Sequence, residues 1–184
     1  MKVLIACEFS GTVRDAFILR GHDAISCDII PSERPGPHIQ EDVLLHLDEG
    51  WDVMIAFPPC TDLAIAGARY WAKKEKDGRV QRAMSFVLDL YNAQIDKIAI
   101  ENPVGLLNTR FRKPDQIINP YQFGDPWKKR TCLWLKGLPK LQPTQIVEPK
   151  GHWVSARCGG AHRSPRIRSL TFPGVAKAMA EQWG

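Results

Sequence analysis

Short apolar runs rich in β-branched residues alternate with amphipathic segments along this chain, and this alternation constrains the fold more than any other feature. The runs at Lys2–Glu8 and Asp52–Phe57 are typical of buried parallel strands. Arg79–Ala93 places apolar residues at the i, i+3, i+4 spacing of one helix face. This order predicts an α/β fold with a doubly wound, mostly parallel sheet. Further strands are predicted at Asp23–Ile30, Lys97–Ile100 and Thr131–Leu135. One further helix is predicted to be capped by Ser10 and to stop at Gly21, and another to run from Val175 to Trp183.

Length and composition predict one soluble domain over residues 1–184. A hydrophobic content of 44% with 24% charged residues is ordinary for a globular protein of 184 residues. No apolar run approaches a membrane span, and Glu8 and Arg14 come too early for a signal peptide, so a cytoplasmic location is expected. Five widely spaced cysteines suit reduced thiols. The stretch 139–165, which contains several prolines and glycines, is expected to be an extended insertion.

Two short segments, Phe57-Pro58-Pro59-Cys60 and Glu101-Asn102-Pro103, each close a predicted strand. In open α/β sheets, ligands bind in the crevice outside the carboxyl ends of the strands. The sequence therefore predicts an active site that contains the Cys60 thiol and the Glu101 carboxyl group. Two plainer interpretations stay open: Cys60 as a small buried hydrophobic residue, and Glu101 as a group that caps a helix or pairs with a nearby arginine.

The turn after the first predicted strand carries a single glycine, Gly11, which would let a ligand approach the backbone at a helix N-terminus. A dinucleotide fingerprint needs three glycines, and Val13 and Arg14 stand where more would be expected. Asp28 lies in the second predicted strand near its end, where a carboxylate can accept hydrogen bonds from ribose hydroxyls. Alone, each feature has a structural explanation. Beside the Cys60 and Glu101 pair, they indicate a nucleoside-containing cofactor.

Positive charge is concentrated in one part of the sequence. Between Arg110 and Arg168, thirteen lysines and arginines face three acids, a balance of +10, whereas the remainder has twelve bases and seventeen acids, a balance of −5. With three tryptophans nearby, the basic half suits phosphates and stacked bases, although an ordinary solvated surface would have the same composition. His152, Cys158 and His162 lack a fourth ligand, so no metal site is predicted.

Four segments carry a resemblance to DNA (cytosine-5)-methyltransferases, because they occur in the order seen in that family: Phe9-Ser10-Gly11, Pro58-Pro59-Cys60, Glu101-Asn102 and Lys128-Lys129-Arg130. The Pro-Pro-Cys and Glu-Asn elements are the specific part. Over roughly residues 2–138, the chain resembles most closely the small phage and prophage proteins described as DNA cytosine methyltransferase-like. The resemblance implies a Rossmann-like methyltransferase domain in a bacterial or phage-infected cell, with DNA as partner and S-adenosylmethionine as cofactor.

The resemblance also implies roles for individual residues. Cys60 would be the nucleophile that adds to carbon 6 of cytosine, Glu101 would protonate or hydrogen-bond N3, and Arg130 would orient the base and the thiolate. Asp28 would bind the ribose, and Asp42 and Phe57 would lie by the adenine. The full cofactor-binding set is Phe9, Ser10, Gly11, Asp28, Asp42, Phe57 and Pro58. The nucleic-acid-binding set is Lys128, Lys129, Arg163, Arg166 and Arg168.

These residue types suit the reaction on chemical grounds. Carbon 5 of cytosine is a poor nucleophile until a group adds at carbon 6 and turns the ring into an enamine. Without a metal, a thiolate is the side chain that is nucleophilic enough at neutral pH, and a positive neighbour or a helix terminus promotes its formation. A carboxyl group whose pKa is raised by burial can supply the proton at N3.

Departures from the family pattern leave the substrate open. Pro103 stands where valine is usual, and Leu138–Ser164 leaves no room for a full target-recognition domain. Because an enzyme that acts on a duplex base must flip it out, this shortness indicates low sequence specificity, a homodimer or helper subunit, or a non-duplex substrate. The alternatives to DNA methylation are C5 modification of free pyrimidine nucleotides and a catalytically idle nucleic-acid-binding module of the same fold.

Overall fold

Seven strands form one sheet at the centre of the fold. The computed structural model describes residues 1–153 and 164–184. The strands are β1 (Lys2–Ala6), β2 (Asp23–Cys27), β3 (His38–Ile39), β4 (Val53–Ala56), β5 (Lys97–Pro103), β6 (Gln116–Ile118) and β7 (Thr131–Lys136). Their order across the sheet is β3-β2-β1-β4-β5-β7-β6. All pairings from β3 to β5 are parallel, whereas β7 runs antiparallel to both β5 and β6.

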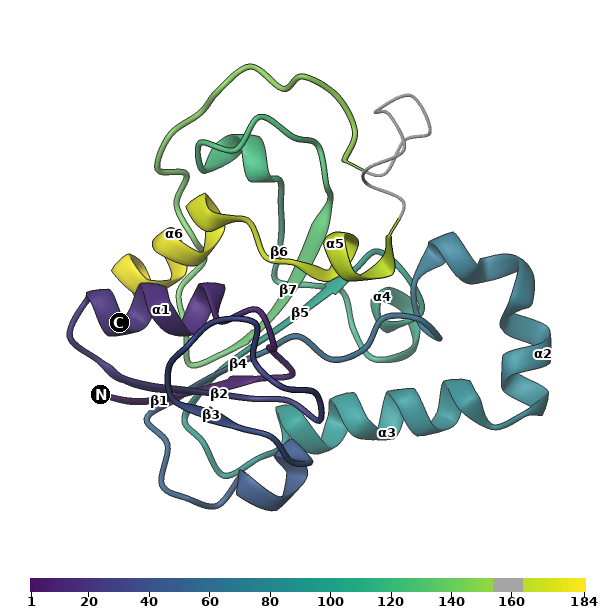
Figure 1. Cartoon of the computed structure of the whole chain (residues 1–184). Coiled ribbons are helices and arrows are strands. Elements are labelled where there is room, and N and C mark those ends of the chain that lie inside the picture. The colour runs from purple at the N-terminus through teal and green to yellow at the C-terminus, as the bar shows by residue number, and fades with distance from the viewer. Residues whose placement is uncertain (154–163) are drawn as a thin grey trace.

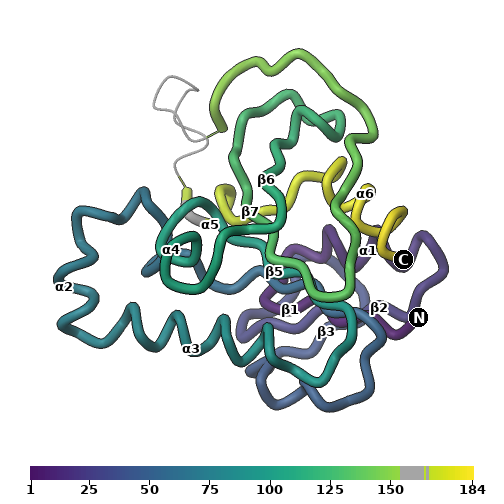
Figure 2. Tube along the Cα trace, turned by 180° about the vertical axis from the view of Figure 1, so that it is seen from behind, coloured from purple at the N-terminus to yellow at the C-terminus, as the bar shows by residue number. Residues whose placement is uncertain are grey.

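Helices cover both faces of the sheet, which makes a doubly wound α/β architecture compatible with a Rossmann-like fold (Figures 1 and 2). Helices α1 (Thr12–Leu19) and α6 (Pro173–Trp183) pack together on one face, and α3 (Arg79–Tyr91) lies on the other. The remaining helices are α2 (Trp71–Lys76), α4 (Leu107–Arg110), α5 (Pro165–Ser169) and the 3₁₀ helices η1 (Val43–His46), η2 (Ile65–Tyr70) and η3 (Pro120–Gln122).

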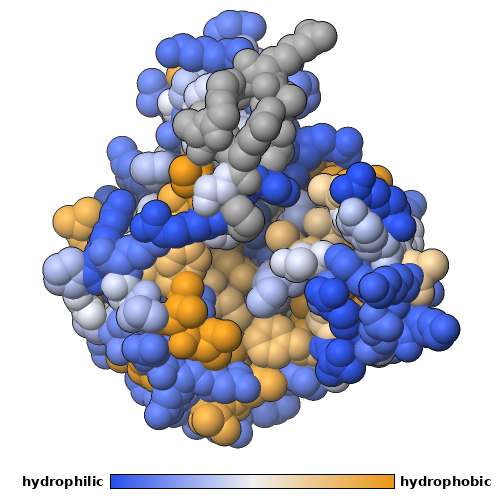
Figure 3. Space-filling model, turned by 45° about the vertical axis from the view of Figure 1, so that its right-hand side comes forward, coloured by the Kyte–Doolittle hydropathy of each residue, from blue (hydrophilic) through white to orange (hydrophobic). Residues whose placement is uncertain are grey.

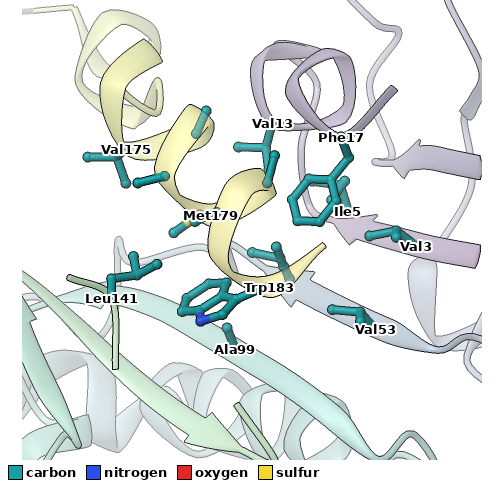
Figure 4. Packing of buried hydrophobic residues seen from close by; sticks show 14 of the residues in the cluster. Val3, Ile5, Val13, Phe17, Val53, Ala99, Leu141, Val175, Met179 and Trp183 are labelled. Carbon is teal, nitrogen blue, oxygen red and sulfur yellow. The ribbon is translucent and has the colours of Figure 1, made fainter. Parts of the chain in front are cut away.

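The central strands are buried on both faces, which explains their nearly uninterrupted apolar sequences. On one face, Met179 and Trp183 of α6 pack with Phe17 of α1 over strand residues that include Val3 and Val53 (Figure 4). Alternate residues of the same strands point to the opposite face and pack with α3. Burial of one such large apolar side chain contributes about 1.5–3 kcal/mol to stability.

The predicted strands and helices are present, although the first two strands end earlier than predicted, at Ala6 and Cys27, so that Asp28 follows β2. The structure also adds short elements. Strands β3 and β6 and helix α2 have only two, three and six residues, too few to show a hydrophobic period. Strand β5 continues beyond Ile100 to Pro103, so Glu101 lies within the strand. No helix of the described residues is both long enough and apolar enough to cross a membrane.

The start of α1 differs from the prediction. Gly11, with a φ of 70°, is the N-cap instead of Ser10. The buried carboxylate of Glu8 accepts hydrogen bonds from the N–H of Val13 (2.8 Å) and the hydroxyl of Ser10 (2.9 Å). The hydroxyl of Ser10 itself accepts a hydrogen bond from the N–H of Thr12 (3.2 Å), so Ser10 and Glu8 share the capping of α1. The predicted stop at Gly21 is confirmed by its φ of 82°.

The described part of the predicted insertion, 139–153, runs along the connection between β6 and β7. The N–H of Val147 donates to the carbonyl of Tyr121 (2.9 Å). The Trp153 ring lies 5.2 Å from Trp127 and 4.8 Å from Phe172, centroid to centroid. This stretch is thus an extended segment packed on the sheet's β7 side, and residues 154–163 of the insertion lie outside the described residues.

Candidate active site

Cys60 and Glu101 lie at the same edge of the sheet. Strands β4 and β5 are adjacent and parallel, with Ala56 opposite Ile100, so the segments at their carboxyl ends meet. The strand order reverses between β1 and β4, because the chain adds β2 and β3 on one side of β1 and β4 and β5 on the other. Such a switch point opens a crevice outside the carboxyl ends of the strands. Both predicted motifs therefore border the crevice expected to bind a ligand.

A hydrogen-bonded turn presents Cys60. Its carbonyl oxygen accepts hydrogen bonds from the N–H groups of Leu63 (3.1 Å) and Ala64 (2.8 Å). Just before the turn, the carbonyl of Pro58 accepts a bond of 2.8 Å from Nδ2 of Asn102, a side chain only 1% exposed. The residue that follows Glu101 thus ties the Pro-Pro-Cys segment directly to β5.

The far end of this turn is fixed by a close backbone approach. The N–H of Leu106 donates to the carbonyl of Leu63 (2.9 Å), and a Cβ atom at Gly105 would lie 2.1 Å from the same oxygen. No side chain fits at position 105 without displacing the turn. The glycine that follows the Glu-Asn-Pro-Val segment is therefore required by the contact with the Cys60 turn.

Burial and charge act together on Cys60 and Glu101. Burial raises the pKa of the Cys60 thiol, and the neighbouring Glu101 carboxylate raises this pKa further, while the positive charge of Lys129 lowers it. Burial likewise raises the pKa of Glu101, and Lys129 and the Thr131 hydroxyl oppose that shift. Cys60 and Glu101 are thus within electrostatic reach of each other, and Lys129 is a cation that acts on both.

Glu101, Lys129 and Phe57 line a small cavity that the segment 171–179 closes on one side. Its volume of about 20 Å³ is room for about one water molecule. A pyrimidine ring does not fit inside it. Figure 3, which turns the right-hand side of Figure 1 forward, shows a wider hollow with an apolar floor and hydrophilic side chains around it.

Arg130 does not join Cys60 and Glu101, contrary to the expectation for an orienting arginine. Leu133 of β7 lies opposite Glu101, so alternation along the chain places Thr131 and Lys129 on the Glu101 side. Arg130 is exposed and its charge acts on Cys132, which faces the α3 side of the sheet. The cation that accompanies the pair is therefore Lys129, a residue predicted from the sequence to bind nucleic acid.

Helix α5 brings a second cation to the site. Nζ of Lys129 donates to the carbonyls of Arg168 (3.0 Å) and Leu170 (3.4 Å). The charge of Arg168, an exposed residue, lowers the pKa of Cys60 together with Lys129. The end of α5 therefore lies within electrostatic reach of the thiol.

The other predicted nucleic-acid-binding residues differ in their surroundings. Lys128 is exposed. Arg166 is 65% exposed and its Nε lies 2.5 Å from Oε1 of Glu33, so an acid of the chain already balances its charge. Arg163, like Cys158 and His162, lies outside the described residues.

The turn after β1 is filled by the chain's own side chains. A Cβ atom at Gly11 would lie 2.5 Å from the guanidinium of Arg14, which is 0% exposed. This guanidinium donates to Oγ of Ser32 (3.1 Å) and to the carbonyl of Pro35 (3.0 Å), and so fastens the loop 31–37 beside the turn. The space left by Gly11 is therefore taken by Arg14, and the predicted ligand approach at this glycine is closed in this structure.

Asp28 and Asp42 lie together at the carboxyl end of β2, where both charges act on Cys7. Oδ1 of Asp28 accepts a bond from the N–H of Ile30 (3.2 Å), and burial raises the pKa of Asp28. Asp42 caps η1 through a bond of 3.0 Å from the N–H of Leu44. The two carboxyl groups offer hydrogen-bond acceptors for ribose hydroxyls, and Ile30, which is 45% exposed, offers apolar surface for a flat base.

Four other residues of the predicted cofactor set make contacts within the protein. Phe57 lines the cavity beside Glu101, next to β4, and not the Asp28 end of the sheet. The carbonyl of Pro58 is bonded to Asn102, and the hydroxyl of Ser10 to Glu8. The carbonyl of Phe9 accepts a bond from the N–H of Glu33 in the loop 31–37 (2.8 Å). These four residues shape the edge of the crevice.

The site roles of Lys129, Thr131 and Asn102 were not predicted from the sequence. A signal for Lys129 was present, since it stands two residues before Thr131, where the predicted strand begins, and side chains two residues apart in an extended chain share a face. The sequence does not show that Lys129 and Glu101 lie on the same face of the sheet. That depends on the antiparallel pairing of β7 with β5, which joins segments distant in sequence.

No family model matches the chain, and no curated protein matches it.

Proposed function

We propose that the chain is a DNA (cytosine-5)-methyltransferase-like enzyme that transfers a methyl group from S-adenosylmethionine to carbon 5 of cytosine. The observation that carries this proposal is the meeting of Cys60, Glu101 and Lys129 at the carboxyl ends of β4 and β5. A thiol, a carboxyl group with a raised pKa and a neighbouring cation are the groups that nucleophilic activation of a pyrimidine requires.

Each residue has one step in the proposed reaction. The Cys60 thiolate, favoured by Lys129 and Arg168, forms a bond to carbon 6 while Glu101 gives a proton to N3. Carbon 5 of the resulting enamine would then bond to the methyl group, whose bond to the sulfonium sulfur of the cofactor would break and leave S-adenosylhomocysteine. The proton of carbon 5 passes to water, the bond between carbon 6 and sulfur breaks, and N3 returns its proton to Glu101. The Cys60 thiolate and the protonated Glu101 carboxyl group are thereby restored for the next turnover.

The residues at the end of β2 fit the nucleoside half of S-adenosylmethionine. Asp28 and Asp42 would accept hydrogen bonds from its hydroxyl and amino groups, and exposed Ile30 would contact the base. When bound, the cofactor supplies an electrophilic methyl group. Glu8 already holds helix N–H groups and Arg14 fills the turn, so the amino-acid half of the cofactor would lie outside that turn.

Exposed cations around the site support DNA as the substrate. Lys128 and Arg168 are exposed, and Arg168 lies close enough to act on Cys60. A phosphate group beside the target base would therefore meet positive charge without displacing the catalytic side chains. The described part of the insertion packs against the chain itself, so its packed side is not available to contact bases. This packing favours an enzyme that methylates DNA with low sequence specificity.

The test is the transfer of labelled methyl from S-adenosylmethionine to duplex DNA, single-stranded DNA and free cytidine nucleotides in parallel. C60A and E101Q are the controls, and binding of S-adenosylhomocysteine by calorimetry shows that each protein is folded and loaded. Label that digests to 5-methylcytosine from either DNA and disappears in C60A is the expected result.

The other outcomes separate the alternative functions. Label in the free nucleotides alone would assign a pyrimidine nucleotide C5-modifying enzyme. Absence of label in all three acceptors, together with salt-sensitive DNA binding that persists in C60A, would assign a binding module and overturn the proposal.

A further inference from the structure

We propose that Lys74 of α2 is a positioning residue that holds the Cys60 turn, and thereby the thiol, in place. This inference rests on the proposed role of Cys60 as the nucleophile. Lys74 belongs to a short helix outside the sheet and outside the four motif segments of the sequence. Its contact with the turn is therefore additional to the contacts that the motif segments make.

The Cys60 turn needs support on its outer side. Its inner side is fixed by β5, where Asn102 bonds to the carbonyl of Pro58, and by the segment after β5, where the N–H of Leu106 bonds to the carbonyl of Leu63. Both contacts lie two or three residues from Cys60. Thr61, the residue directly after the nucleophile, is exposed. Neither of the two hydrogen bonds just described involves Thr61.

Lys74 supplies that support. Its Nζ donates to the carbonyl of Thr61 at 2.5 Å and lies 3.2 Å from Oδ1 of Asp62. Lys74 is only 8% exposed, and a Cβ atom at Gly67 would lie 3.3 Å from the same Nζ. Burial of an ammonium group is costly unless it is paired and hydrogen-bonded. A buried lysine with these partners is therefore committed to the two residues that follow Cys60.

The same contacts connect the turn to a projecting arm. The segment from η2 to the start of α3 extends away from the sheet (Figures 1 and 2). Asp62 is shared between Lys74 and Arg79, whose Nη2 lies 2.7 Å from Oδ1. Movement of the arm is therefore transmitted to Thr61 and Asp62, and from there to the adjoining thiol.

Loss of the Lys74 charge would not by itself lower the pKa of Cys60, because removal of a positive charge disfavours a thiolate. A lower pKa of Cys60 after substitution of Lys74 would therefore come from a change in the position of the turn. Burial and Glu101 both raise the pKa of Cys60, so a turn released into solvent would lower this pKa and expose the thiol.

The experiment compares K74M with K73M. Both substitutions remove one positive charge from α2, but Lys73 is exposed whereas Lys74 is buried. The rate of iodoacetamide alkylation of the Cys60 peptide is measured by mass spectrometry from pH 6 to 10, with C60A identifying the peptide. This readout does not require methyl transfer, so it tests Lys74 even if the proposed function fails.

In K74M, we expect alkylation of Cys60 at neutral pH to be roughly three- to tenfold faster, with a midpoint at lower pH, and kcat to fall about 10- to 100-fold with little change in KM. K73M should match the parent protein, and K74R should restore most of the parent profile. If K74M does not fold, K74Q, which keeps one donor and loses the ion pair, takes its place in the comparison. Identical alkylation profiles for the parent, the Lys73 variant and the Lys74 variant would overturn the proposal.

Discussion

The crevice has two ends, one after β4 and β5 and one at the turn between β1 and α1, and different groups fill them. Both ends lie outside the carboxyl ends of parallel strands. At the β4–β5 end, Asn102 and Gly105 fix the backbone and leave the Cys60 and Glu101 side chains partly exposed. At the β1–α1 turn, Arg14 fills the space beside Gly11. The contrast teaches that a glycine in a motif position shows only that room is needed, and the neighbouring side chains decide whether a ligand or the protein takes that room.

The strongest test of this contrast compares one half-buried thiol from each end of the crevice. C60A should lower methyl transfer by at least ~10³-fold, because no other described side chain at β4–β5 offers a thiolate. C7A, which removes the half-buried thiol after β1, should keep activity within about tenfold, since that thiol has no step in the reaction. Transfer of labelled methyl to DNA measures both. Equal losses in the two variants would remove the distinction between the ends.

The second test asks whether the β1–α1 turn is structural. R14M leaves Asp15 and the loop carbonyls without their buried donor, so we expect the free energy of unfolding to fall by about 3 kcal/mol. R20M is the matched control, because Arg20 follows the same helix, is 54% exposed, and pairs with Glu181 only at 4.0 Å. Urea unfolding measures the difference. A loss in R14M no larger than that in R20M would show that Arg14 is dispensable to the turn.

The third test concerns the cation at the β4–β5 end. Lys129 lowers the pKa of both Cys60 and Glu101, so K129M should raise both pKa values. Less thiolate then forms at neutral pH, the alkylation profile of Cys60 moves to higher pH, and methyl transfer at neutral pH falls about tenfold. K128M, which removes an exposed charge one residue away, should leave the alkylation profile unchanged. A profile unaffected by K129M would contradict the placement of this charge.

The smallest expected effect lies at the end of β2. D28N weakens one hydrogen-bond acceptor for the ribose, so the affinity for S-adenosylhomocysteine should fall about three- to tenfold. D23N, at the opposite end of the same strand, is the control. Titration calorimetry gives both dissociation constants, and equal affinities in the two variants would move the nucleoside site away from Asp28.

Strand content and the meeting of Cys60 with Glu101 could be predicted, because buried parallel strands are apolar throughout and neighbouring strands end at one edge. The partner cation could not be chosen between Lys129 and Arg130, since adjacent residues of a strand face opposite sides and the register with β5 is set by tertiary pairing. Arg14 in an eight-residue helix looks like a surface residue until the loop 31–37 is seen to cover it. Lys73 and Lys74 are likewise indistinguishable in a helix of six residues.

Helix α6 also has a consequence for how the protein is made. Its residues Met179 and Trp183 complete the layer over β1 and β4, two strands that lie far earlier in the sequence. Contacts between such distant segments slow folding, because a long loop must close before they form. During synthesis, this apolar face of the sheet therefore stays uncovered until α6 has emerged from the ribosome. A chaperone that shields exposed apolar strands during that interval should increase the yield.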